Sequence, residues 1–239
     1  MTKVTPYNST ESKKKQVTKM FDNIAGSYDF LNHTLSLGMD NIWRKTAIKK
    51  LSINTSKILD IATGTADFAI SAAKYTNANI TGIDISQGML DIGVEKISKK
   101  GLTDRIQLQL ADSEKLPFKE NSYDGITAGF GVRNFENLNK GLSEMHRTLK
   151  PGGVVAILEP SEPTYFPLKQ FYKLYFHHIL PFIGGIISKD KNAYSYLPDS
   201  VSAFPSGNDF LIELEKVGFK ESKHIPLTFG IVSLYVAIK

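Results

Sequence analysis

The order of apolar and polar residues divides much of the chain into alternating strand-like and helix-like segments. Apolar runs typical of buried strands occur at 58–61, 79–85 and 154–158. Between such runs, apolar residues recur every three or four positions, most clearly over 138–149, which predicts amphipathic helices packed on a sheet. Strands that alternate with helices in this way predict an α/β fold with a doubly wound, mostly parallel sheet.

The two outer parts of the predicted sheet have patterns of their own. Residues 105–110 alternate strictly between polar and apolar side chains, which favours a strand at the sheet edge. Near the C-terminus, we expect a helix over 209–217, followed by two strands, 221–227 and 231–238, that form a hairpin. Ser86, which follows the second strand, is a candidate N-cap for the next helix.

The first 52 residues carry the periodicity of helices. Apolar side chains at positions 17, 20, 21 and 24 share one helical face, and Gly26-Ser27 is expected to interrupt that helix. A second helical segment is expected to close at Gly38, and a third runs from Trp43 to about residue 51. Because this region precedes the first strand, we expect it to lie across the ligand site as a cover.

The alternation of strands and helices breaks over residues 160–205, where aromatic side chains are frequent. Seven of the 23 residues between 165 and 187 are aromatic: Tyr165, Phe166, Phe171, Tyr172, Tyr175, Phe176 and Phe182. This segment is therefore interpreted as an insertion in the sheet fold.

Composition narrows the class of protein. With 239 residues, 41% hydrophobic and 22% charged, the chain is an ordinary globular sequence of one domain, or of one domain with an insertion. It has no apolar run long enough for a transmembrane helix, and its polar N-terminus lacks a signal-peptide core, so we expect a cytoplasmic protein. The absence of cysteine excludes disulfides and thiolate chemistry.

The most informative stretch is 57–68, KILDIATGTADF, which is typical of a strand, a turn of small residues and the start of a helix. Asp84 follows twenty residues after Gly64, at the end of the next strand, where an acid can accept hydrogen bonds from ribose hydroxyls. The turn lacks the G-x-G-x-x-G pattern of dinucleotide sites, and Asp60 disfavours a pyrophosphate. A nucleoside with a cationic end, such as S-adenosylmethionine, suits this turn better. The alternative is an ordinary strand–turn–helix corner without a ligand.

Seven motifs connect the chain with a known family: FDNIAGSYDFLN (21–32), LDIATGTADF (59–68), DIS (84–86), ADSEKLPF (111–118), ITAGFGVRN (126–134), LKPGG (149–153) and FHHILPFIG (176–184). In these motifs the chain resembles the class I methyltransferases that use S-adenosylmethionine. Among them it most closely resembles the ubiquinone/menaquinone biosynthesis C-methyltransferases of the demethylmenaquinone branch. The resemblance runs from about residue 17 to the C-terminus.

This resemblance implies a Rossmann-like sheet of seven strands, mostly parallel with an antiparallel C-terminal strand. It implies S-adenosylmethionine as the methyl donor and carbon methylation of a prenylated hydroquinone, most closely demethylmenaquinol to menaquinol. The chain then divides into a helical cover (1–52), a cofactor-binding core (53–159), an aromatic helical insertion on the substrate side (160–205) and a C-terminal helix and hairpin (206–239). One departure is that Ala62 and Ala66 replace two glycines of the general turn.

The resemblance also indicates cofactor-binding residues. Thr65 and Gly64 belong to the turn, and Asp84 is expected to hold the ribose diol. Asp112 is expected to accept a hydrogen bond from the adenine amino group, with the backbone N–H of Ser113 directed at a ring nitrogen. Gly129, at the end of the fourth strand, is expected to lie beside the sulfonium. Each of these positions has an alternative interpretation as a helix cap or a solvated turn.

Carbon methylation needs an electron-rich ring, and loss of a proton from the quinol hydroxyl supplies that electron density. Arg133 follows Gly129 in the loop at the carboxyl ends of the strands, where it could stabilise the phenolate. Asn134 and Tyr28 are expected to orient the quinol or a water molecule. The alternatives are a surface salt bridge for Arg133 and a core aromatic role for Tyr28.

Two further kinds of chemistry receive less support. His177 and His178 are adjacent, so on a helix at most one of them faces a site, and packing is the favoured role. No metal-ligand spacing of the usual kinds is present, so we expect no metal.

Other functions and partners stay open at this stage. The same fold serves other small-molecule and RNA methyltransferases, and a non-catalytic protein could retain the cofactor site. Lys and Arg exceed Asp and Glu by only five, so nucleic acid is not expected as a partner. A prenylated substrate suggests peripheral contact with the inner face of the membrane through 165–187, although these aromatics could instead form a buried cap. The oligomeric state is undetermined.

Overall fold

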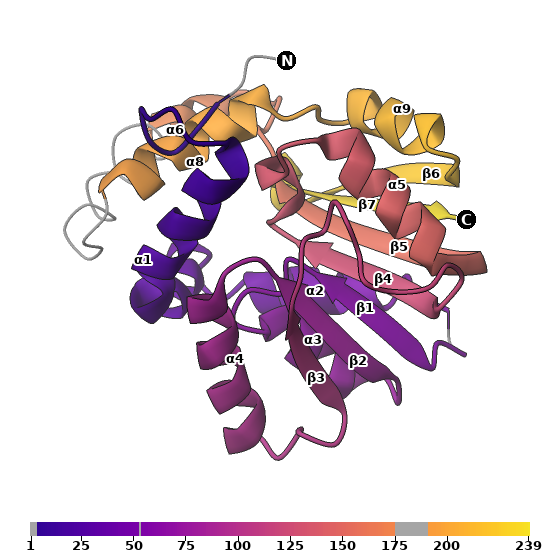
Figure 1. The fold of residues 1–239 in the computed structure, drawn as a ribbon. Helices are drawn as coiled ribbons and strands as arrows, with labels where there is room; N and C mark the ends of the chain where they lie inside the picture. The colour runs from indigo at the N-terminus through magenta and orange to yellow at the C-terminus, as the bar shows by residue number, and fades with distance from the viewer. Residues whose placement is uncertain (1–3, 53, 175–190) are drawn as a thin grey trace.

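The fold is built on one seven-stranded sheet (Figure 1). The computed structural model describes residues 4–52, 54–174 and 191–239. The strands are β1 (Lys57–Ile61), β2 (Asn79–Asp84), β3 (Ile106–Leu110), β4 (Tyr123–Gly129), β5 (Leu149–Pro160), β6 (Lys220–Leu227) and β7 (Val232–Ile238). Their order is β3-β2-β1-β4-β5-β7-β6, and β7 runs antiparallel to both of its neighbours while the remaining pairs are parallel. The predicted fold class, the edge position of β3 and the terminal hairpin are thereby confirmed.

Helices cover both faces of this sheet. They are α1 (Lys13–Leu35), α2 (Asp40–Ile48), α3 (Asp67–Tyr75), α4 (Gln87–Lys99), α5 (Leu138–Thr148), α6 (Leu168–Leu174), α8 (Lys191–Ala203) and α9 (Asn208–Lys216), with 3-10 turns η1 (Val132–Asn134) and η3 (Thr228–Gly230). Trp43 of α2 and Phe68 of α3 are buried in the core on one face, and Met145 of α5 and Phe210 of α9 in the core on the other. The result is the three-layer arrangement expected of a doubly wound sheet.

The strand order places the ligand site. The chain moves outward from β1 to β2 and β3, then crosses back to β4 on the other side of β1. In open α/β sheets, ligands bind beside the carboxyl ends of the strands at such a switch point. The turn after β1, the end of β2 and the end of β4 therefore meet at this edge.

The predicted interruption at Gly26-Ser27 is wrong, because α1 is one continuous helix from Lys13 to Leu35. Gly26 is exposed, and the residues before it, Ile24 and Ala25, are buried in a cluster that also contains Met89 of α4. Packing of this face outweighs the cost of about 1 kcal/mol that an exposed glycine adds within a helix. The chain turns instead at Gly38, whose φ of +74° favours glycine.

The aromatic insertion contains both buried and exposed side chains. Tyr172 and Tyr196 are buried, whereas Tyr165 and Phe166 are 73% and 82% exposed. Residues 175–190 lie outside the described part of the chain, so the predictions for Tyr175, Phe176, His177, His178 and Phe182 do too, as does the side chain of Phe171. None of the helices in the described ranges combines the length and apolar character that crossing a membrane requires.

Asp60, next to the last residue of β1, generates a prediction about stability and pH. Its carboxylate is fully buried and accepts hydrogen bonds from Thr63 Oγ1 at 2.5 Å and Thr127 Oγ1 at 2.7 Å. Burial raises the pKa of Asp60 to about 6, although the two hydroxyls oppose that shift. The folded protein therefore holds this proton more tightly than the unfolded chain, and the contribution of Asp60 to stability falls as pH rises from about 4 to about 6.

We expect Asp60→Asn to remove this pH dependence. Between pH 4 and pH 7, the free energy of unfolding of wild type should therefore fall by roughly 2–3 kcal/mol relative to that of the variant. Urea unfolding across that range measures the difference. Asp124→Asn is the control. Although burial opposes its ionisation, hydrogen bonds from Lys150 and Ser56 hold the pKa of Asp124 well below its usual range. Its contribution to stability therefore falls only below about pH 4, and wild type and Asp124→Asn should differ by a nearly constant free energy of unfolding between pH 4 and pH 7. A pH-independent difference between wild type and Asp60→Asn would contradict the assignment.

Candidate functional site

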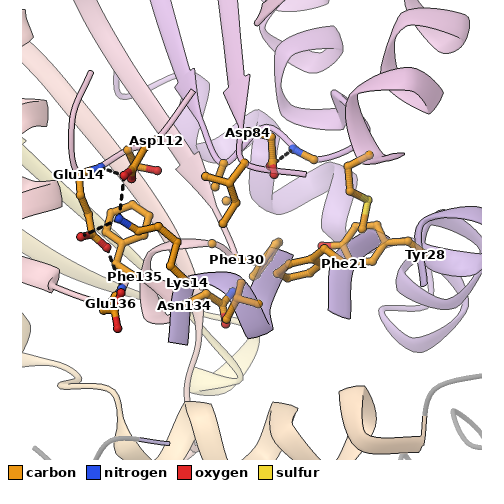
Figure 2. A pocket seen from close by; sticks show the side chains of 18 residues that line it. Lys14, Phe21, Tyr28, Asp84, Asp112, Glu114, Phe130, Asn134, Phe135 and Glu136 are labelled. Carbon is orange, nitrogen blue, oxygen red and sulfur yellow. Dashed lines mark hydrogen bonds and ion pairs between the residues drawn. The ribbon is translucent and has the colours of Figure 1, made fainter. Parts of the chain in front are cut away.

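A small cavity of about 50 Å³ lies at the carboxyl ends of β1, β2 and β4 (Figure 2). Its walls come from the turn after β1, the ends of β2 and β4, the segments that follow β2, β3 and β4, the first turn of α4, and α1 from Lys14 to Tyr28. The lining residues are Lys14, Val17, Phe21, Tyr28, Ala62, Gly64, Asp84, Ile85, Met89, Asp112, Ser113, Glu114, Gly129, Phe130, Gly131, Asn134, Phe135 and Glu136. The structure thus brings five of the six predicted cofactor-binding residues to one cavity.

Asp84 holds the turn after β1 in place. Its Oδ2 accepts a hydrogen bond from the backbone N–H of Gly64 at 2.8 Å, and its Oδ1 accepts one from Ser86 at 2.9 Å. Burial raises the pKa of Asp84, and backbone hydrogen bonds from Ser86, Gly64 and Ile85 oppose the shift. An ionised carboxylate has about four acceptor sites, so about one is left for a hydroxyl group of a ligand.

Unusual backbone conformations shape this turn. Gly64 has a φ of +55°, and the two alanines that replace expected glycines, Ala62 and Ala66, also have positive values of +52° and +68°. The left-handed region costs a non-glycine residue about 1–2 kcal/mol. A Cβ at Gly131 would overlap the Cβ of Ala62, so the loop after β4 approaches the turn as closely as glycine permits. The departure from glycine therefore leaves the shape of the turn intact.

Asp112 is engaged by a residue that sequence reasoning missed. Lys14 Nζ, in the first turn of α1, lies 2.7 Å from Asp112 Oδ2 and 3.2 Å from Glu114 Oε2 (Figure 2). Partial burial opposes its charge, but hydrogen bonds from Lys14 to the two carboxylates raise its pKa. The opposite charges of Lys14 and the acidic loop were visible in the sequence, but 98 residues separate Lys14 from Asp112.

Thr65 lies behind the cavity and is not among its lining residues. It is buried, its Oγ1 donates to Asp29 of α1, and the same oxygen accepts a hydrogen bond from Lys96 Nζ at 3.1 Å. Lys96 also forms ion pairs with Asp29 and Asp67. Thr65 thus links the turn after β1 to the covering helix.

A second, larger cavity of about 440 Å³ adjoins the first. Most of its wall is apolar. The lining residues are Met20, Phe21, Ile24, Tyr28, Asn32, Ser36, Leu37, Met39, Asp40, Trp43, Arg44, Phe130, Arg133, Pro160, Leu168, Tyr172, Ala193, Tyr196, Leu197, Ile231 and Val232. Phe21, Tyr28 and Phe130 line both cavities, so the two spaces meet at these three rings.

Arg133 belongs to the larger cavity. Its side chain is only 9% exposed and its Nη1 lies 3.0 Å from Glu159 Oε2, so its salt bridge is buried and not on the surface. Nη1 also donates to the carbonyl of Phe130, and Nε donates to Ser200 Oγ at 3.3 Å. No described residue accepts a hydrogen bond from Nη2, which leaves its two N–H groups for a ligand. Burial raises the pKa of Glu159, while the charge of Arg133 opposes that shift.

Asn134 and Tyr28 lie close to the junction of the cavities. Asn134 Oδ1 accepts a hydrogen bond from Tyr196 at 3.1 Å, and its buried Nδ2 has no hydrogen-bond partner among the described residues. Tyr28 packs edge-on against Phe21, with ring centroids 6.0 Å apart. Burial raises the pKa of Tyr28, so its hydroxyl stays protonated at neutral pH. Both side chains can therefore donate hydrogen bonds near the junction.

Among the described residues, one cluster has ligand atoms close enough for a metal ion. Those of His33, Asp40 and Asp67 lie within 4.8 Å of one another. Arg44, however, contacts both carboxylates, and Lys96 lies 2.5 Å from Asp67. These cations compensate the negative charge of the two aspartates, so we describe the cluster as an ion-pair network.

Comparison with known proteins agrees with this geometry. The model of the ubiE/COQ5 methyltransferase family matches residues 9–239. A demethylmenaquinone methyltransferase of Bacteroides fragilis is 47% identical over 99% of this chain and 98% of its own length. The ubiquinone/menaquinone biosynthesis C-methyltransferase UbiE of Geotalea daltonii is 46% identical over 95% of this chain and 97% of its own.

Solved structures share the fold at low sequence identity. A SAM-dependent methyltransferase from Thermotoga maritima superposes with a TM-score of 0.67 at 18% identity, over 93% of this chain and 99% of that one. Another, from Aquifex aeolicus, has a TM-score of 0.56 at 18% identity, over 77% and 81% of the two chains. The chain belongs to the ubiE/COQ5 methyltransferase family and is an S-adenosylmethionine-dependent methyltransferase.

Proposed function

We propose that the protein methylates a ring carbon of a prenylated hydroquinone, with demethylmenaquinol as the substrate that the names of its relatives favour. The observation that carries the proposal is the junction of two unlike cavities. One is small and lined by Asp84, Asp112 and Ser113, and the other is large and mostly apolar. The polar lining of the first cavity therefore suits the groups of a nucleoside, the apolar lining of the second suits a prenylated ring, and the two cavities meet.

The smaller cavity suits S-adenosylmethionine. The carboxylate of Asp84 would hold the ribose diol, and Asp112 and Ser113 would hold adenine. Gly64 and Gly129 leave room for the ligand, and Thr65 supports the turn from behind. The unpartnered Nδ2 of Asn134 supports a ligand in this space. When bound, the cofactor supplies an electrophilic methyl group on its sulfonium.

Arg133 and its neighbours would act on the acceptor ring. Glu159, Phe130 and Ser200 fix the guanidinium, so that the free N–H groups of Nη2 are oriented before the ligand arrives. A quinol hydroxyl that loses its proton becomes a phenolate, and hydrogen bonds from Nη2 would stabilise the negative charge in this mostly apolar cavity. Asn134 and Tyr28 would orient the ring at the junction.

The outer segments would complete the substrate side. The helical cover (1–52) and the aromatic insertion (160–205) supply most of the apolar wall of the larger cavity, which would receive the isoprenoid tail. Tyr165 and Phe166 are largely exposed beside Lys169, which is also exposed. Exposed aromatics and lysines suit the headgroup level of anionic lipid, so the protein would bind the inner face of the membrane peripherally through 165–187.

Replacing Asp84 should weaken cofactor binding. Each ribose hydrogen bond to a carboxylate is worth about 1.5–3 kcal/mol, so Asp84→Ala is expected to raise the Kd for S-adenosylmethionine at least tenfold by calorimetry. Asp91→Ala, an exposed acid on α4, is the matched control and should bind as wild type does. An unchanged Kd in Asp84→Ala would rule out this placement of the ribose.

Replacing Arg133 should act on turnover. If Arg133 stabilises charge that develops only as the quinol ionises, Arg133→Ala lowers kcat by roughly 10²–10³ while cofactor affinity stays nearly intact. Arg133→Ala also leaves Glu159 without its buried partner, so we expect a lower melting temperature and measure thermal unfolding in parallel. Arg133→Lys should recover part of the lost kcat and part of the lost stability. Arg147→Ala, which breaks the more exposed pair with Glu144, is the control. Normal turnover in folded Arg133→Ala would refute this role.

Removing exposed aromatics should weaken membrane binding. We expect Tyr165→Ser/Phe166→Ser to reduce co-sedimentation with anionic liposomes about tenfold, because two rings no longer enter the lipid interface. Val94→Ser/Leu110→Ser removes exposed apolar side chains from α4 and β3 and should bind as wild type does. Equal binding of all three proteins would show that this surface does not contact lipid.

A further inference from the structure

A second buried ion pair lies on the wall of the larger cavity. Three of the described residues that line that cavity are charged, namely Arg133 and the pair formed by Asp40 and Arg44 in α2. The side chains of Asp40 and Arg44 are 3% and 7% exposed. Burying two charges is costly, and replacing a buried ion pair by hydrophobic residues often leaves the stability of a protein unchanged. An ion pair beside an apolar cavity therefore points to recognition of a polar group of a ligand.

Asp40 retains capacity to accept a hydrogen bond. Its Oδ2 lies 2.5 Å from Arg44 Nη1 and 2.8 Å from His33 Nδ1, and its Oδ1 accepts from Ser36 Oγ at 2.9 Å. A carboxylate has about four acceptor sites, so about one remains, on Oδ1. Burial opposes ionisation, but Arg44 lowers the pKa of Asp40, so the group is a carboxylate at neutral pH and accepts hydrogen bonds only.

The two hydroxyls of the acceptor ring require different hydrogen-bond partners. A 1,4-hydroquinone carries them on opposite edges of the ring, and Arg133 would donate hydrogen bonds to the hydroxyl that ionises. The second hydroxyl remains a donor and needs an acceptor. In the oxidised quinone both oxygens are carbonyls, which only accept hydrogen bonds, so a carboxylate opposite one of them is left unpaired and repels it.

We propose that Asp40 accepts the hydrogen bond of the second hydroxyl and that this contact makes the cavity select the hydroquinone over the quinone. The inference rests on the proposed function, because it requires a 1,4-dihydroxy ring in this cavity. Arg44 is then a positioning residue that fixes the carboxylate. Tyr28, Asp40 and Arg133 line the same cavity, so a ring held beside Tyr28 would have both charged groups on its wall.

Binding of small rings tests the inference without turnover. Trp43 is the chain's single tryptophan and lines the cavity, so its fluorescence reports occupancy. Under anaerobic conditions, wild type is titrated with 1,4-dihydroxynaphthalene, 1,4-naphthoquinone and 1,4-dimethoxynaphthalene, of which only the first carries hydroxyl donors. We expect the dihydroxy ring to bind at least about tenfold more tightly than the other two, because each of those leaves the Asp40 carboxylate without a donor.

Two variants assign the preference to one residue. Asp40→Asn offers an amide that can donate to a carbonyl, so the preference for the dihydroxy ring should shrink to about threefold or less. Asp67→Asn is the matched control, since Asp67 contacts the same Arg44 but does not line the cavity, and it should keep the wild-type preference. Thermal unfolding and S-adenosylmethionine affinity show whether each variant is folded.

Two results would overturn the inference. One is that wild type binds all three rings with similar affinity, which contradicts the role of Asp40 even if Asp40→Asn does not fold. The other is that folded Asp40→Asn prefers the dihydroxy ring as strongly as wild type does. Methyl transfer to a prenylated quinol by wild type is measured in the same preparation. If methyl transfer occurs while the preference for the dihydroxy ring is absent, the proposed function stands and the role of Asp40 fails. If the preference is present but no quinol is methylated, the proposed function fails.

Discussion

Both cavities depend on the docking of α1 across the carboxyl edge of the sheet. Polar contacts fix this helix along its length. Lys14 pairs with Asp112, Asp22 Oδ1 accepts hydrogen bonds from Ser86 Oγ and the Gly88 N–H, and Asp29 pairs with Lys96. Between these contacts, Met20 and Ile24 are buried against α4 and α8. Without α1, the smaller cavity would be an open sheet edge and the larger one would lose a wall.

Buried charge is concentrated where the covering elements meet the sheet. Arg133 with Glu159 and Arg44 with Asp40 are ion pairs whose side chains are almost completely removed from solvent. Each pair is extended by neutral or charged hydrogen-bonding partners, as burial of ions requires. Their rigidity has a chemical use, because a donor that is already oriented does not reorganise when negative charge develops on the ring.

The sheet was predictable because its signals are local. The apolar runs gave the strands, the strict alternation over 105–110 placed β3 at the edge, and the cap at Ser86 is made as expected, with its side chain accepting from the Met89 N–H. These patterns need only neighbouring residues. The same reasoning wrongly divided α1 at Gly26, since the packing that keeps the helix continuous comes from α4 and α8, which are distant in sequence.

The candidate site was predictable only in part. Asp84, Asp112 and Gly64 stand in motifs and reach the same cavity, whereas Lys14 and Glu114 were missed. Asp40 and Arg44 were also missed, because i,i+4 pairs are common on solvated helices and only the fold shows that this one faces a cavity. Thr65 was associated with the cofactor turn, but its hydroxyl is turned toward Asp29 and Lys96.

The contact between Ala62 and Gly131 has a consequence for how sequences of this kind can diverge. The turn after β1 and the loop after β4 have room for one methyl group between them, and here Ala62 supplies it. A chain with glycine at position 62 would be free to carry alanine at 131, whereas alanine at both positions would force the two loops apart. The identities of these residues, 69 positions apart, are therefore coupled through shared volume, and we expect them to covary among homologous sequences.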